Sequence, residues 1–161
     1  MTEDMKPRLF GSDAEVRHLG EGLIACTLPK PEWTHEAHLA ATLWLACERE
    51  DIALDEKLPN LIRRYNESVG GVNDSTEGYH ETITRCFLAG IRLHLAATRA
   101  DLPLVEKVNR LLLSPRGQRD WPLLFYSRDR LFSAEARLSW IPPDLRPLPQ
   151  APFQIEADAP L

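Results

Sequence analysis

Two short motifs place histidine side chains at the start of apolar segments. The first, Thr34-His35-Glu36-Ala37-His38, carries two histidines three residues apart, and the second, Tyr79-His80-Glu81-Thr82, carries a third. Side chains three residues apart on a helix are neighbours, so His35 and His38 can reach one metal ion or one small ligand. Three imidazoles with an open fourth position are the ligand set of a catalytic zinc or related divalent metal site.

Two carboxylates in the same motifs are candidates for a catalytic base or a further metal ligand. Glu81 is the first candidate, and Glu36 is the second. Each also has a simpler explanation. Glu81 stands four residues before Arg85, as in a surface ion pair, and Glu36 falls in a first helical turn, where an acid stabilises the helix dipole. The catalytic residue is therefore left unassigned.

The apolar periodicity predicts an all-α, up-and-down bundle of about five main helices. Ser12 and Thr34 are predicted N-caps for the first two helices, which end near Cys26 and Arg49. A third helix is expected to start between residues 55 and 59, a fourth to span about 78–98, and a fifth to begin at Asp101. Asp74 and Glu77, in the loop 70–78, are predicted to cap the fourth helix.

The bundle topology predicts where the histidines meet. Consecutive helices in an up-and-down bundle are antiparallel, so the second and fourth run parallel and begin at the same end. His35, His38 and His80 are then expected at that end, with the loop 70–78 as a cover. His94 lies about 21 Å further along the fourth helix, at 1.5 Å per residue, and His18 is on the first helix.

The chain length predicts one domain followed by a tail. With 161 residues, 43% of them hydrophobic and 27% charged, the chain is typical of a globular protein. We expect one helical domain over residues 1–140, with short helices between 127 and 140. Six prolines fall in the last 21 residues, which predicts an extended tail over 141–161, docked through Ile141, Leu145 and Leu148.

The net charge and the hydropathy of the chain limit the classes of partner that it is expected to bind. The net charge of -5 argues against nucleic acid or an anionic membrane as a partner. No apolar run has the length needed to span a bilayer, and no apolar signal core follows Met1. A cytoplasmic location is expected, with a small molecule as the partner and the oligomeric state left open. Arg128 and Arg137 are candidate ligand-binding residues, because guanidinium groups bind carboxylate or phosphate. Tyr79, in the second histidine motif, is a third candidate.

The histidine motifs also carry a resemblance. Thr34, His35, His38, Tyr79, His80, Glu81, Thr82 and Thr84, together with Arg137 and Pro143-Asp144, resemble a set of small uncharacterised bacterial proteins that have no established activity. The resemblance spans residues 33–144 and implies a family without implying a catalytic role. A looser similarity, of architecture and of three histidines, links the chain to the metal-binding helical bundles of the DinB kind.

Three hypotheses follow from the residues. In the first, His35, His38 and His80 hold a divalent metal (zinc, iron, nickel or manganese) that activates water for hydrolysis or transfer on a small substrate. In the second, a non-enzymatic domain binds a small anionic ligand or a partner protein. In the third, the histidines are structural and hydrogen-bond backbone carbonyls or hydroxyls.

Overall fold

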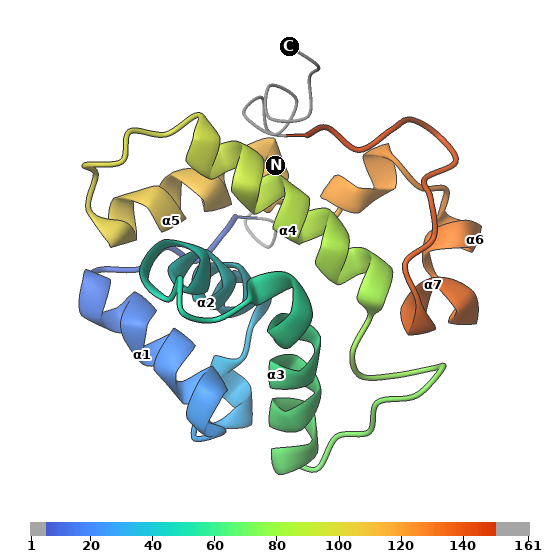
Figure 1. Cartoon of the computed structure of the whole chain (residues 1–161), viewed down its shortest axis with the longest axis horizontal. Coiled ribbons are helices and arrows are strands. Elements are labelled where there is room, and N and C mark those ends of the chain that lie inside the picture. The colour runs from blue at the N-terminus through green and yellow to red at the C-terminus, as the bar shows by residue number, and fades with distance from the viewer. Residues whose placement is uncertain (1–5, 151–161) are drawn as a thin grey trace.

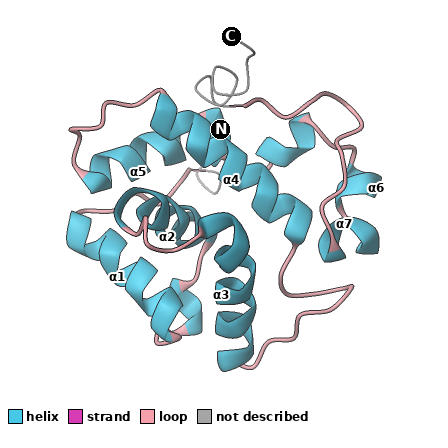
Figure 2. Ribbon diagram, in the orientation of Figure 1, coloured by secondary structure: helices cyan, strands magenta, loops and turns pink. Residues whose placement is uncertain are grey.

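A computed structural model describes residues 6–150 and confirms the all-α fold (Figures 1 and 2). Every regular element in this part of the chain is helical. No helix among the described residues combines the length and apolar character needed to cross a membrane. The main helices are α1 (Asp13–Ala25), α2 (His35–Glu48), α3 (Leu54–Ser68), α4 (Glu81–Ala96) and α5 (Leu104–Leu113); the short ones are η2 (Lys30–Glu32), η3 (Pro115–Gly117), η4 (Trp121–Leu124), α6 (Arg128–Leu131) and α7 (Ala134–Leu138).

Helix α2 lies at the centre of the fold and contributes seven of the 22 buried residues of the main core among the described residues. Its buried residues run without interruption from Leu39 to Leu45, because the segment is apolar on nearly every side. Helix α1 packs closely against it: a Cβ atom on Gly20 would lie 2.0 Å from a ring carbon of Trp44. In Figure 1, α2 is viewed nearly end-on, while α4 runs across the picture. Helix α4 therefore crosses α2 and does not run alongside it.

Two of the three predicted helix caps are confirmed. The side chains of Ser12 and Thr34 accept hydrogen bonds from the backbone N–H groups of Glu15 and Ala37. The predicted cap at Asp74 and Glu77 is wrong. The Asp74 carboxylate accepts from the N–H groups of residues 76 and 77 and closes a turn inside the loop, and α4 begins only after His80. An Asp that binds nearby backbone in a turn has the same sequence pattern as a cap.

The C-terminal segment forms a second, smaller core against α4. The buried residues of this second core are Cys86, Trp121, Phe125, Tyr126, Leu131, Ala136 and Ile141. The Tyr126 hydroxyl donates to the carbonyl of Ile141 at 2.5 Å, which fixes the start of the proline-rich segment. The docking predicted for Leu145 is made by its backbone N–H, which donates to Phe125, while its side chain is exposed. The part of the predicted tail beyond residue 150 lies outside the described residues.

Candidate functional site

His35 and His38 stand in the first turn of α2, and each donates one ring proton to a backbone carbonyl. His35 Nε2 lies 2.9 Å from the carbonyl oxygen of Gly117, and His38 Nδ1 lies 2.8 Å from that of Thr34. A carbonyl oxygen can only accept, so these two nitrogens carry the protons. The other nitrogens, Nδ1 of His35 and Nε2 of His38, therefore hold lone pairs.

Burial keeps both imidazoles neutral near pH 7. Removal from water lowers the pKa of His38 to about 4 and also lowers the pKa of His35, and the positive charge of Arg119 acts in the same direction on both. Aromatic rings pack on each imidazole. The Trp33 ring lies 3.9 Å from His38, centroid to centroid, and Phe87 lies 5.3 Å from His35. The two histidines are thus fixed, uncharged acceptors.

Both histidines line a cavity of about 310 Å³ between α2, α3 and α4. Seven apolar side chains form most of its wall: Leu39, Leu58, Ile62, Ile83, Phe87, Leu88 and Ile91. The polar part of the wall consists of His35, His38, Thr42, Thr84 and Arg119. An apolar cavity with a few convergent polar groups is the usual form of a small-molecule site.

Arg119 comes from the turn between η3 and η4 and reaches the cavity from the solvent side. Its guanidinium lies 3.6 Å from a carboxylate oxygen of Glu36, and its side chain is 69% exposed. Glu36 is largely buried and does not line the cavity. The predicted catalytic candidate Glu36 is therefore the ion-pair partner of the arginine at the cavity edge.

Gly117 sets the position of the carbonyl that binds His35. A Cβ atom at this residue would lie 2.3 Å from the carbonyl oxygen of Leu111, so the η3 turn passes closer to α5 than any larger residue allows. The residue is buried, and its carbonyl accepts the ring proton of His35, which lies 82 residues earlier in the sequence.

His80 is engaged at both ring nitrogens, unlike the other two predicted metal ligands. Its Nδ1 accepts the backbone N–H of Ile83 at 3.1 Å and so caps α4. Its Nε2 donates to the carbonyl of Leu131 at 2.9 Å, and burial lowers its pKa. His80 lines a wider groove of about 600 Å³ that adjoins the cavity and shares His38 with it. As the side chains stand, two of the three predicted metal ligands have a free lone pair.

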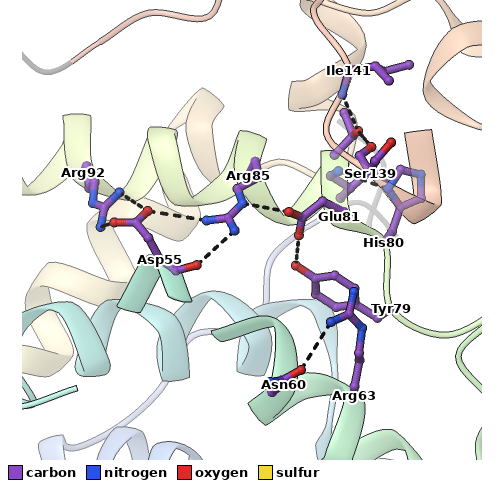
Figure 3. Close-up of polar contacts among 12 residues, drawn as sticks. Asp55, Asn60, Arg63, Tyr79, His80, Glu81, Arg85, Arg92, Ser139 and Ile141 are labelled. Atoms are coloured by element: carbon purple, nitrogen blue, oxygen red, sulfur yellow. Dashed lines mark hydrogen bonds and ion pairs between the residues drawn. The ribbon is translucent and has the colours of Figure 1, made fainter. Parts of the chain in front are cut away.

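The other candidate residues in the second motif form a polar chain on the surface of α4 (Figure 3). The Tyr79 hydroxyl donates to Glu81 at 2.5 Å, and Arg85 donates to the other Glu81 oxygen at 3.2 Å. Arg85 also donates to the backbone carbonyl of Asp55, whose carboxylate takes two 2.8 Å bonds from Arg92. Glu81 thus belongs to a link between α3 and α4, as the ion-pair explanation of its position predicts.

Tyr79, Arg128 and Arg137, the predicted ligand-binding residues, are not gathered at the cavity. Tyr79 lies on the wider groove, where Arg63 covers its ring at 4.6 Å. Arg128 packs on the ring of Phe132. Arg137 donates to the carbonyl of Gly78 at 2.7 Å and so pins the end of the loop 70–78.

The remaining histidines lie apart, as their spacing predicts. His18 is exposed and faces Glu32, and His94 donates to the carbonyl of Lys107. Among residues 6–150, no group of three or more histidine, cysteine, aspartate or glutamate side chains is arranged to hold a metal ion. Sequence reasoning missed Arg119 and the apolar wall. The signal for the wall was the apolar stripe on each helix, which core packing explains equally well.

Comparison with protein-family models, with curated proteins and with solved structures gives no match for this chain.

Proposed function

We propose that this protein is a binding domain for a small, largely apolar molecule, which occupies the cavity between α2, α3 and α4. The observation that carries the proposal is the lining: seven apolar side chains and five polar ones, among them His35 and His38. A cavity of about 310 Å³ has the size of known small-ligand sites. Transfer of the ligand from water into such a lining supplies the favourable free energy.

The second hypothesis from the sequence, a non-enzymatic binding domain, is kept here with an apolar ligand in place of a small anion. A small anion would need a cation that is free to bind it. Arg119 is the one cationic side chain in the wall, and it already faces Glu36. The apolar wall, and not a cluster of arginines, is therefore the main determinant of binding.

Filling the cavity tests this function. Ile83 lines the cavity and is partly exposed, so Ile83→Phe adds a ring to open space and is expected to cost at most the 1–3 kcal/mol of an overpacked site. We expect calorimetric titration to show that para-propylanisole binds the natural protein. In Ile83→Phe its affinity should be lower by a factor of about ten or more. Leu61→Phe, on α3 outside the cavity, is the matched control and should bind normally. Equal affinity of the natural protein and Ile83→Phe would place the ligand outside this cavity and refute the proposal.

A second candidate function, a divalent metal on His35 and His38, is supported by one observation. Metal-binding histidines almost always donate their second ring proton to a carbonyl or carboxylate, as both of these residues do. Water or substrate would supply the remaining ligands, and hydrolysis or transfer on a small substrate would be the reaction class.

Metal titration separates this candidate from the first. If a metal binds, zinc, nickel, iron or manganese should give a one-to-one calorimetric isotherm with the natural protein and about tenfold weaker binding in His35→Ala. His18→Ala, at an exposed site outside the cavity, controls for metal bound by surface histidines. Equal metal binding by the two variants would exclude a site on α2.

A further inference from the structure

Three of the five polar residues in the cavity wall present hydrogen-bond acceptors. His35 donates its ring proton to Gly117, and His38 donates its own to Thr34. The Thr42 hydroxyl donates to the carbonyl of His38 at 2.7 Å. All three residues line the cavity, and all three give their proton to the backbone. What remains on each of them is a lone pair.

The two imidazole lone pairs reach open space. Among the described residues, Trp33 Nε1 is the one fully enclosed side-chain nitrogen or oxygen that lacks a hydrogen-bond partner. The free nitrogens of His35 and His38 have no partner either, so they are not enclosed. His35 lines the cavity, and His38 lines both the cavity and the wider groove beside it. The unpartnered Trp33 N–H, being enclosed, offers no donor there.

We propose that the ligand is a hydroxylated apolar molecule, an alcohol or a phenol, whose O–H donates to a free imidazole nitrogen in the cavity wall. This inference rests on the proposed function and specifies its ligand class. A hydroxyl satisfies an acceptor that would otherwise lose its water when an apolar ligand enters, and an unsatisfied acceptor costs about 1–3 kcal/mol. The same molecule without the hydroxyl leaves that cost in place.

The charges around the cavity disfavour the two ionic alternatives. An ammonium group also donates, but the wall contains no carboxylate, and Arg119 repels a cation. A carboxylate would face the two lone pairs, and the charge of Arg119, the one cation in the wall, is offset by Glu36 at 3.6 Å. Burial holds the pKa of both imidazoles below the usual value, so they do not become donors for an anion near neutral pH.

Three probes that share a para-propylphenyl group test the ligand class on the unmodified protein. Calorimetry near neutral pH compares para-propylphenol, its methyl ether para-propylanisole, and para-propylbenzoate. We expect the phenol to bind about tenfold more tightly than the ether, and the benzoate to bind more weakly than the phenol. In His38→Leu the preference for the phenol over the ether should shrink, while His18→Leu should keep it.

Each outcome separates this inference from the proposed function. Equal binding of phenol and ether overturns the hydroxyl preference and leaves the apolar cavity standing. Tightest binding by the benzoate overturns it in favour of an anion at Arg119. Phenol binding that disappears with a metal chelator overturns it in favour of a metal on α2. Binding of none of the three probes refutes the proposed function itself.

Discussion

Replacement of His80 by alanine is expected to lower the free energy of unfolding by about 2–4 kcal/mol. The imidazole has two structural roles. It caps α4 by accepting the backbone N–H of Ile83, and it donates to the carbonyl of Leu131 on α6. Loss of a helix cap costs about 1 kcal/mol, and a buried carbonyl left without its donor costs about 1–3 kcal/mol more. Chemical denaturation followed by circular dichroism measures the change.

Two further variants identify the source of this loss. His80→Asn can still accept the N–H of Ile83 but is too short for Leu131, so it should recover the capping part, about 1 kcal/mol. His18→Ala, at an exposed histidine, should change stability by less than about 0.5 kcal/mol. If His80→Ala were as stable as the natural protein, the structural role of His80 would be wrong and a ligand role would have to be reconsidered.

Acidification is expected to destabilise the fold between about pH 6.5 and pH 4. Burial lowers the pKa values of His35, His38, His80 and His94 in the folded state, whereas an unfolded histidine titrates near 6.5. Below about pH 6.5 the unfolded chain binds more protons than the folded one, so stability falls as the pH falls. His38, with a folded pKa of about 4, alone contributes a loss of about 3 kcal/mol at about 1.4 kcal/mol per unit.

The measurement is the free energy of unfolding across this range. Carboxylates contribute at lower pH, because arginine partners hold the pKa values of Glu48 and Asp55 below their ordinary range. His38→Gln keeps a donor at the position and removes the titrating group, so its stability should fall less steeply below about pH 6.5. A natural protein equally stable at about pH 7 and about pH 5 would contradict the burial of these imidazoles as neutral groups.

The helices and two of their caps were predictable because the information for them is local. Ser12 and Thr34 can be identified as caps because each hydroxyl stands just before a helical segment and can accept the backbone N–H three residues later. An uninterrupted apolar run identifies α2 as the central helix. Local patterns also misled at Asp74, where a turn in the loop and a helix cap use the same side-chain chemistry.

The arrangement of the site was less predictable because it depends on contacts distant in sequence. The partner of His80 lies 51 residues away, and that of His35 lies 82 residues away. The helix directions inferred from an up-and-down bundle also did not predict that α4 crosses α2. The grouping of His35 and His38 followed from helical spacing alone, and the structure places both on one cavity.

The backbone carbonyl of Gly117 has a consequence for how the sequence can diverge. It holds the proton of His35 on Nε2. The position of the backbone therefore determines that the other nitrogen, Nδ1, is a hydrogen-bond acceptor. Side chains around the η3 turn can change without altering that character. A larger residue at Gly117 itself, which would collide with Leu111, would displace the carbonyl and release the ring to its other tautomer. A position that contributes no side chain thus governs the tautomer of the imidazole that it contacts, and with it the kind of ligand expected at the proposed site.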